Sequence, residues 1–540
     1  MFSDPWSPAS RRSTLYARHG AVATSQPLAA QVGLDVLKQG GNAADAAIAV
    51  AAMLNVVEPM STGIGGDAFC LYYQARSRRI FVLNGSGCSP RAANIQRFAA
   101  DGLSDSIPLT HPHSVTVPGT VAAWADTITR FGTRSLAHVL APAITYARAG
   151  FAVSPIIAGS WALCAPKLRE AGSYLPGGEP PEVGQVVRLP ELADSLDAIG
   201  QSDGRDFYEG RLANKIVAHH QRLGGLLSAE DLAAHESTWV EPISINFGGV
   251  RVFQCPPNGQ GLAVLIALGI LQGFDDLAEC GEVLRCHRMI EAIRLAFADA
   301  RRWVTDLEFG NTKAVVESLL EPGYLAQRRS QIVDGVRSEC VESGIALPGG
   351  PDTVYLTVVD GEGNACSFIN SLFHGFGSGI VVPGTGICLQ NRGALFSMNP
   401  THPNRLEPGK RPYHTIIPAM STHKDGSLHA SFGVMGGFMQ PQGQVQLLVN
   451  RLILGLDPQQ AMDAPRFLLR DGDPEANIAY ESGFCGGGIT ALEFSGHQME
   501  RVDGWGRVLF GGGQYIERDP GTGVLACASD PRKDGQAVGW

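Results

Sequence analysis

One threonine in this chain, Thr353, stands where its hydroxyl could serve as a nucleophile. It follows the Pro- and Gly-rich residues 347–352 and precedes a run of alternating hydrophobic residues, 354–359. A threonine hydroxyl alone is a weak nucleophile, but an N-terminal threonine has a free amine that can take its proton. The ordinary pKa of an α-amine is about 7.7–8.0, so part of it is neutral near pH 7. Residue types and spacing leave two interpretations open: a catalytic N-terminus created by cleavage after Asp352, or an ordinary loop residue.

The residues next to Thr353 are predicted to form a β-hairpin. Residues 354–359 alternate in hydrophobicity, which is typical of a half-buried strand, and the turn-forming residues 360–364 follow. Residues 365–372 are predicted to be the returning strand. The other nearby threonine, Thr357, lies in the middle of the first strand and is interpreted as structural.

The rest of the chain is predicted to combine helices with short strands. The predicted helices include 27–38 with a capping hydroxyl at Ser25, 43–57 capped by Asn42, 137–149, 189–199, 261–271, 282–303 and 442–454. The predicted strands include 68–74, 80–84, 429–434, 514–518 and 524–528. Segment 43–57 is Ala-rich and apolar on most sides, so we expect it to be buried between other layers.

The composition is that of a globular chain without a nucleic-acid or membrane partner. By length alone, 540 residues suggest three or four domains. A net charge of -10 and a pI near 5.8 disfavour nucleic-acid binding. The 11 cysteines are scattered without a CxxC pair, so we expect reduced thiols in the cytoplasm. No signal peptide is evident at the N-terminus, and no apolar window of about 18 residues predicts a membrane span.

Two short motifs match known signatures without their structural context. Residues 63–68 match the dinucleotide-binding glycine pattern, but a predicted helix precedes them and a predicted strand follows. Residues 200–204 match the nucleophile elbow of serine hydrolases, yet the preceding segment has helical spacing, so Ser202 is interpreted as a polar loop residue. The histidines of 111–113 and 219–220 lack companions at metal-ligand spacing. We therefore expect no cofactor and no metal.

A set of glycine-containing motifs runs in one order from about residue 20 to the C-terminus. These motifs are Gly40–Ala47, Gly63–Asp67, Pro118–Trp124, Pro256–Gly261, Asp352–Gly379, Lys410–Pro412, Gly436–Gly437, Ala464–Phe467 and Ser529–Arg532. On them the chain resembles the γ-glutamyltransferase (glutathione hydrolase) family of N-terminal nucleophile hydrolases. Each motif alone is weak, whereas the ordered set is specific.

The resemblance implies an α+β fold, a four-layer αββα sandwich made as one proenzyme. Thr353 would attack the carbonyl of Asp352 and pass through an ester. The products would be a large piece, 1–352, and a small piece, 353–540, which remain together as a heterodimer. The several domains suggested by length would then give way to one composite domain.

The resemblance also assigns catalytic roles in the mature protein. Thr353 would attack a small-molecule amide, and Ser371 would hydrogen-bond the nucleophile in place of the family's second threonine. Gly436 and Gly437 match the family's oxyanion-hole glycines, whose N–H donors are typically worth a few kcal/mol each. The acyl group would then pass to water or to an amino-acid acceptor, which the sequence does not distinguish.

The substrate-recognition positions depart from the family's pattern. Ser86 or a neighbour stands where the family has an arginine for the substrate α-carboxylate, and Leu395 stands near its acid for the α-ammonium. Phe373 replaces an expected asparagine, while His414 and Thr415 replace paired serines. An ammonium left unpaired in a pocket costs several kcal/mol, so these changes disfavour γ-glutamyl specificity.

Arg392 and its neighbour Asn391 complete the candidate pocket. Arg392 occupies a position where the family has a neutral amide, and its planar guanidinium suits a carboxylate. We therefore expect a pocket for a carboxylate without a neighbouring ammonium. Glutaryl, succinyl or oxamate-like amides fit it, as in the family's acylase and amidohydrolase branches. The alternative is that Arg392 pairs with structural carboxylates and another group binds the substrate.

Three functional interpretations remain at this point. The favoured one is a self-processing amidohydrolase or acyltransferase that cleaves γ-glutamyl or related carboxyacyl amides through Thr353. The second is a serine esterase that uses Ser202 and needs no chain cleavage. The third is a non-catalytic relative, a binding or scaffold protein that turns nothing over whether or not its chain is cut.

Overall fold

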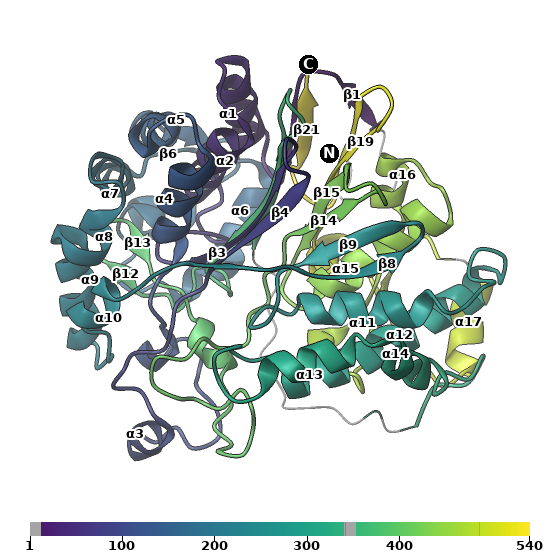
Figure 1. The fold of residues 1–540 in the computed structure, drawn as a ribbon. Coiled ribbons are helices and arrows are strands. Elements are labelled where there is room, and N and C mark those ends of the chain that lie inside the picture. Colours follow the sequence, from purple (N-terminus) through teal and green to yellow (C-terminus); the bar gives the residue numbers. More distant parts are fainter. Residues whose placement is uncertain (1–11, 340, 342–352, 485) are drawn as a thin grey trace.

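Two seven-stranded β-sheets lie back to back, and helices cover the outer face of each (Figure 1). The computed structural model describes residues 12–339, 341, 353–484 and 486–540. The first sheet has the order β21 (Gln536–Gly539), β2 (Ala21–Thr24), β10 (Val354–Val359), β11 (Ala365–Ser371), β3 (Asp67–Gln74), β4 (Arg79–Gly85) and β7 (Thr238–Val240). The second has the order β1 (Leu15–Ala17), β20 (Leu525–Ser529), β19 (Gly512–Arg518), β15 (Leu428–Met435), β14 (Ala419–Thr422), β9 (Val250–Gln254) and β8 (Ile243–Phe247). The predicted αββα sandwich is confirmed.

Three clusters of buried hydrophobic residues fill the spaces between these layers. The first joins the first sheet to helices α1 (Pro27–Lys38), α2 (Ala43–Val57), α4 (Thr120–Phe131), α5 (Leu136–Ala149) and α7 (Pro190–Gln201). The second joins the second sheet to α11 (Gly261–Leu271), α12 (Glu282–Trp303) and α15 (Met439–Leu448). The third lies between the sheets and combines Phe69 and Tyr355 of one with Met420 and Ile516 of the other. Each sheet is thus buried on both faces.

Strands β10 and β11 form the predicted hairpin and lie at the centre of the first sheet, between β2 and β3. The prediction of a half-buried strand is wrong, because every residue of β10 is buried. Val354, Leu356 and Val358 belong to the cluster beneath the helices, and Tyr355 and Val359 belong to the cluster between the sheets. The alternation therefore distinguishes two buried faces rather than core from solvent.

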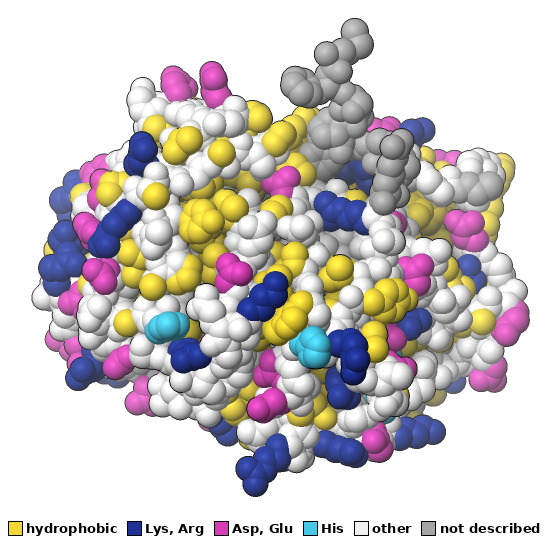
Figure 2. Space-filling model, turned by 90° about the horizontal axis from the view of Figure 1, so that it is seen from above, with side chains coloured by type: hydrophobic (Ala, Val, Ile, Leu, Met, Phe, Trp, Pro, Cys, Tyr) yellow, Lys and Arg dark blue, Asp and Glu magenta, His cyan; other side chains and the backbone are white. Residues whose placement is uncertain are grey.

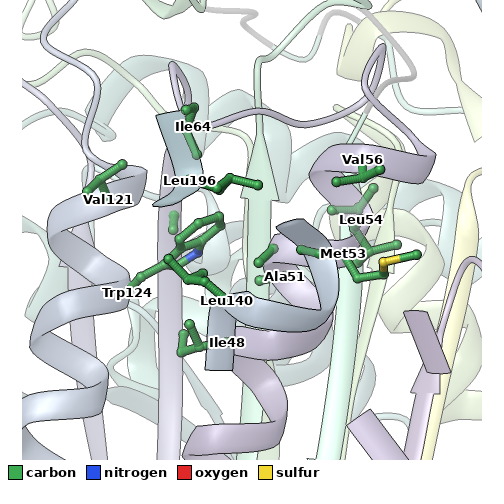
Figure 3. Packing of buried hydrophobic residues seen from close by; sticks show 14 of the residues in the cluster. Ile48, Ala51, Met53, Leu54, Val56, Ile64, Val121, Trp124, Leu140 and Leu196 are labelled. Carbon is green, nitrogen blue, oxygen red and sulfur yellow. The ribbon is translucent and has the colours of Figure 1, made fainter. Parts of the chain in front are cut away.

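Helix α2 is buried along its whole length, as its composition predicts. Asn42 caps it by accepting hydrogen bonds from the N–H groups of Ala44 and Asp45 at 2.9 and 3.1 Å. Small residues let neighbouring helices approach closely: a Cβ on Gly33 of α1 would lie 2.4 Å from Cγ2 of Val50. Ile48, Ala51 and Met53 of α2 lie in the same cluster as Trp124, Leu140 and Leu196 (Figure 3). This helix supports β10 and β11 from outside.

Some predicted helix ends differ from the structure. The N-cap of α1 is Gln26, whose side chain accepts from Leu28 N at 2.6 Å, while the Ser25 hydroxyl donates to the carboxylate of Glu58. The helix predicted over 442–454 begins earlier, at Met439, and α15 ends at Leu448 with a wider π-type turn over Val449–Ile453. Predicted helices 261–271 and 282–303 coincide with α11 and α12.

The surface that includes the β1 and β21 end of the sandwich carries both signs of charge. Lys/Arg and Asp/Glu side chains are interspersed on this face rather than segregated (Figure 2). Within the described ranges, no helix combines the length and apolar character needed to cross a membrane.

Candidate active site

Thr353 and Ser371 face each other across the open end of the central hairpin. Val354 pairs with Asn370 in the antiparallel register, which sets the preceding Thr353 opposite Ser371. The two hydroxyl oxygens lie 3.2 Å apart, and both residues are buried. The N–H of Phe373 donates to Ser371 Oγ at 2.8 Å, so the Ser371 proton can be donated to Thr353. Asp352, the other half of the expected cleavage site, lies outside the described residues.

Gly436 and Gly437 form a turn directly after β15. Their φ values are +122° and +57°, a region that L side chains rarely adopt, and a Cβ on Gly436 would lie 3.0 Å from Gly511 Cα. Met439 N–H donates to the Gly436 carbonyl at 2.9 Å. Because the C=O and N–H of one trans peptide point in opposite directions, this bond turns the Gly437 N–H away from α15. The turn therefore presents a fixed backbone donor.

Arg392 is fully buried in a short helical turn, Arg392–Leu395. Its Nη1 donates to Thr415 Oγ1 at 2.7 Å, and its Cζ lies 4.5 Å from the centre of the Phe373 ring. Its Nε and Nη2 have no hydrogen-bond partner among the described residues. These two nitrogens form one edge of the guanidinium, and their parallel N–H bonds match both oxygens of a carboxylate. Burying such an edge unpaired is costly, so it is suited to an anionic ligand.

Phe373 has a backbone conformation that is rare for a residue with a side chain. Its φ is +79°, which costs on the order of 1–3 kcal/mol unless the surroundings enforce it. The bond from its N–H to Ser371 and the contact of its ring with Arg392 enforce it here. Phe373 therefore connects the nucleophile pair with the guanidinium.

Asp67, at the start of β3, is the buried acid of this region. Its Oδ1 accepts from the N–H groups of Gly87 and Gly119 at 3.1 and 3.2 Å, and its Oδ2 lies 3.1 Å from His414 Nε2. Burial raises the pKa of Asp67 to about 7, against the opposing effect of the Arg392 charge. Burial, helped by the same charge, holds the pKa of His414 well below its ordinary value, so the imidazole is neutral.

The charges of Arg392 and Asp67 influence each other. Burial lowers the pKa of Arg392 from its ordinary value, and the charge of Asp67 opposes this change. With Asp67 protonated the group of Arg392, Asp67 and His414 carries one positive charge, and with Asp67 ionised it carries none. The site therefore favours an anion most strongly when Asp67 is protonated.

The remaining predicted pocket residues are engaged by the protein itself. Ser86 donates to Asn84 Oδ1 at 2.7 Å and lies in the loop that holds Asp67. Asn391 donates to the Leu109 carbonyl at 3.1 Å and accepts from His374 N–H at 3.3 Å. Their polar groups support the loops around the site.

Leu395 is fully buried and belongs to the cluster beneath the second sheet. An alkyl side chain at this position offers no charge to an ammonium group.

The segments 200–204 and 63–68, which match short signatures of other protein classes, lack the structural context that those signatures require. Ser202 caps the C-terminus of α7, where its hydroxyl donates to the Ala198 carbonyl at 2.8 Å, and Gly204 leads into another helix, α8 (Arg205–Glu209). A nucleophile elbow requires a strand before its serine, so Ser202 has the wrong context. The glycine loop 63–68 joins α2 to β3, and a Cβ on Gly66 would lie 2.3 Å from the Ser371 carbonyl oxygen. This loop packs against the candidate site.

The histidines of 111–113 and 219–220 make structural contacts. His113 Nε2 lies 2.8 Å from Asp101 Oδ2, and His220 Nε2 lies 2.9 Å from the Pro112 carbonyl oxygen. Among the described residues, no three His, Cys, Asp or Glu side chains are grouped to hold a metal ion.

Sequence reasoning did not single out Asp67 or Gln260 as site residues. Each is a polar residue inside a glycine-containing motif of the resemblance, and each is fully buried. A polar residue in such a motif could have drawn attention, but only the fold shows that Asp67 contacts His414 and that Gln260 contacts Thr415 and Gly437.

The sandwich and its central hairpin define the class of protein: it is an N-terminal nucleophile hydrolase. The Gamma-glutamyltranspeptidase family matches residues 29–540, and the chain belongs to this family. It is 39% identical over 520 residues to the glutathione hydrolase-like YwrD proenzyme of Bacillus subtilis, covering 95% of this chain and 97% of that protein. It is 35% identical over 544 residues to the oxamate amidohydrolase proenzyme of Klebsiella pneumoniae, covering 98% and 100%.

A solved relative has the same architecture. The crystal structure of cephalosporin acylase from Bacillus halodurans superposes with a TM-score of 0.92 at 44% identity, covering 100% of this chain and 99% of that one. Family and fold together establish a self-processing amidohydrolase or acyltransferase.

Proposed function

We propose that the protein cleaves carboxyacyl amides through an acyl ester on Thr353, and that Arg392 binds the acyl carboxylate. The observation that carries this is the buried Nε–Nη2 edge of Arg392, which has no partner among the described residues. The guanidinium is joined to the nucleophile by a short series of contacts through Phe373 and Ser371. In this proposal the substrate places its carboxylate on this edge and its scissile carbonyl at Thr353.

Maturation is proposed to separate residues 1–352 from residues 353–540. The Thr353 hydroxyl attacks the Asp352 carbonyl, the peptide C–N bond breaks as the ester forms, and water hydrolyses the ester. The products are a C-terminal carboxylate and a free α-amine on Thr353. Each sheet combines strands that precede residue 353 with strands that follow it. In the first sheet, for example, β10 and β11 lie between β2 and β3. The two pieces would therefore stay together as a heterodimer.

In the mature protein the Thr353 amine is proposed to act as the general base. It takes the hydroxyl proton as Oγ1 attacks the substrate carbonyl, and the oxygen that becomes negative accepts N–H bonds from Gly436 and Gly437. The amine then gives the proton to the leaving nitrogen, and an acyl ester remains. Water or the amine of an amino-acid acceptor removes the acyl group. The Ser371 hydroxyl, with its oxygen 3.2 Å from Oγ1, keeps the nucleophile in position.

The proposed acyl group has a carboxylate and no α-ammonium. An ammonium needs a carboxylate partner in a buried pocket, whereas Leu395 offers none and Asp67 is already bonded to Gly87, Gly119 and His414. Oxamate, named for the Klebsiella relative, is a carboxylate without an ammonium. γ-Glutamyl amides are the second candidate, because the chain belongs to the Gamma-glutamyltranspeptidase family.

Three anilides test the proposal. Glutaryl and γ-glutamyl p-nitroanilides differ only in the ammonium, and valeryl p-nitroanilide has the same carbon length without either charge. We expect kcat/KM to be highest for the glutaryl compound. In Arg392→Ala the KM for it should rise about tenfold to a hundredfold, the usual cost of losing a charged hydrogen bond, with less change for valeryl. Arg392→Lys keeps the charge and loses the planar edge, so it should recover only part of the affinity.

An unchanged KM in Arg392→Ala for every carboxylated anilide would refute the pocket assignment. A wild-type preference for the γ-glutamyl compound over the glutaryl one would favour the second candidate.

A further inference from the structure

Gln260 lies between the candidate carboxylate anchor and the glycine turn. It immediately precedes α11, a helix in which every residue is buried, so its backbone position is rigid. Its own side chain is fully buried. Its backbone N–H donates to the His414 carbonyl at 2.9 Å, which fastens it to the segment carrying Thr415.

The side-chain amide of Gln260 uses both of its donors. Nε2 donates to the Thr415 carbonyl at 2.6 Å and to the Gly437 carbonyl at 3.0 Å. Oε1 accepts from the Tyr413 hydroxyl at 3.0 Å. Two carbonyl oxygens can only accept, so the orientation of the amide is settled by its partners. One side chain therefore bonds to both segments of the site.

These bonds form a continuous path from Arg392 to the turn. Arg392 Nη1 donates to the hydroxyl of Thr415, and Gln260 donates to the carbonyl of the same residue. The second Gln260 donor holds the Gly437 carbonyl, to which Gln440 N–H also donates at 3.3 Å.

The Gly437 carbonyl matters because glycine has no side chain to restrict its dihedral angles. The peptide before Gly437 is held through the Gly436 carbonyl by Met439, and the peptide after it is held through the Gly437 carbonyl by Gln260. Without the Gln260 bond the peptide after Gly437 keeps only the longer bond from Gln440 N–H at 3.3 Å, so the Gly437 dihedral angles are less restricted and the whole turn is held less rigidly. A shift of about 1 Å at a reacting group can cost a hundredfold in rate.

We infer that Gln260 is a positioning residue that couples the carboxylate anchor at Arg392 to the geometry of the Gly436–Gly437 oxyanion turn. The inference rests on the proposed function for the roles of Arg392 and the turn. Gln260 touches neither the substrate nor the reacting atoms in this scheme. Its effect should therefore fall on kcat, while Arg392 governs KM.

The test is Gln260→Met, which keeps the length of the side chain and removes the amide. For glutaryl p-nitroanilide we expect kcat to fall about ten- to a hundredfold, with KM changed less than about threefold. The kcat advantage of glutaryl over valeryl p-nitroanilide should shrink, while the KM difference between them is kept. Arg392→Ala should give the reverse division between KM and kcat.

Gln446→Met is the matched control. Gln446 is also a buried glutamine with three hydrogen bonds, donating to Gln442 and Phe467 carbonyls and accepting from Phe467 N–H at 3.0 Å. It should lose similar stability, read as a lower Tm, and keep kcat within about twofold of the wild type. Equal losses of kcat in both variants, or a Gln260→Met kcat within twofold of the wild type, would overturn the inference.

Self-cleavage gives a second measurement, because it uses the same turn. A folded Gln260→Met precursor that cuts more slowly than Gln446→Met supports the inference, and equal cutting rates contradict it. If Gln260→Met does not fold, Gln260→Glu keeps the shape and the Tyr413 contact while losing both donors, and is read in the same way. If the wild type shows no preference for the glutaryl compound, the proposed anchor at Arg392 is refuted. The effect of Gln260 on the turn can still be measured in that case, by comparing kcat for valeryl p-nitroanilide between Gln260→Met and the wild type.

Discussion

The guanidinium of Arg392 and the hydroxyl of Thr415 are hydrogen-bonded at 2.7 Å in the buried interior of the sandwich. The bond occupies Nη1 and leaves the opposite edge, Nε and Nη2, without a partner in the described part of the chain. The Phe373 ring at 4.5 Å restrains the guanidinium from one face. An arginine held in this way is oriented before a ligand arrives, which reduces the entropy lost on binding.

Thr415→Val tests this orientation, because valine keeps the shape and removes the hydroxyl. The Arg392 guanidinium would lose its only hydrogen bond among the described residues, so the KM for glutaryl p-nitroanilide should rise about tenfold with little change in kcat. Thr357→Val is the matched control, since the Thr357 hydroxyl donates to Ser431 Oγ at 2.6 Å within the space between the sheets. It should lower the Tm and leave KM unchanged. Steady-state kinetics of the two variants measure both KM values. An equal rise of KM in Thr415→Val and Thr357→Val would contradict the role of Thr415 in orienting Arg392.

Ser371→Ala removes the hydroxyl that lies 3.2 Å from Thr353 Oγ1. We expect kcat to fall about tenfold and self-cleavage to slow, because the nucleophile loses a positioning bond worth roughly 1 kcal/mol or more. Ser371→Thr keeps the hydroxyl and should retain most of the activity. Progress curves for anilide hydrolysis and for precursor loss on a denaturing gel measure both effects. Wild-type rates in Ser371→Ala would show that the contact has no catalytic role.

Thr353→Ala should abolish both chain cleavage and turnover. A denaturing gel of the wild type should show bands of about 37 and 20 kDa, the 57.2 kDa chain divided at residue 353 in proportion to length. The variant should give one uncut band. Thr357→Val, which changes the neighbouring threonine of β10, should be cut like the wild type. An uncut wild-type protein with full activity would instead favour a nucleophile other than Thr353.

The sequence predicts the ends of the central hairpin better than its surroundings. The turn residues 360–364 mark the hairpin locally, and β10 has the predicted bounds. Burial of both faces was missed because Tyr355 and Thr357 look suited to solvent. In the fold the Tyr355 hydroxyl lies 2.7 Å from Ser367 Oγ, and Thr357 bonds to Ser431. Ser367 lies on the neighbouring strand β11, but Ser431 belongs to the second sheet, whose position no local pattern specifies.

The same limit applies to the candidate site. Arg392 could be noticed from its residue type, since a planar cation suits a carboxylate. Its edge without a partner among the described residues could not, because that depends on where the fold places Thr415, Phe373 and the carboxylates of those residues. Asp67 and His414 are separated by 347 residues in the chain and lie 3.1 Å apart. Contacts of this kind follow from sheet order rather than from spacing.

The last prediction concerns pH and follows from Asp67. Its pKa is raised to about 7, so Asp67 is mostly neutral at pH 6 and mostly ionised at pH 8. Ionisation cancels the charge of Arg392 within the site, so the KM for glutaryl p-nitroanilide should rise by about three- to tenfold over this interval, as expected for a coulombic change of roughly 1 kcal/mol. Valeryl p-nitroanilide, which has no carboxylate, should show no such rise. Titration of the Thr353 amine changes kcat for both compounds and cancels in the comparison.

Asp67→Asn separates this effect from other titrations, because the amide cannot ionise. In this variant the KM for the glutaryl compound should no longer depend on pH between 6 and 8. The same group also affects stability. Its folded pKa of about 7 exceeds its ordinary value of 3.8, so its contribution to stability is fully present below about pH 3.8 and is lost as pH rises through 7. The free energy of unfolding of the wild type should therefore decline relative to Asp67→Asn over that interval, as denaturant titrations can measure. A parallel pH dependence in both proteins would mean that Asp67 is ionised throughout, and that the charge of Arg392 is already compensated before the substrate binds.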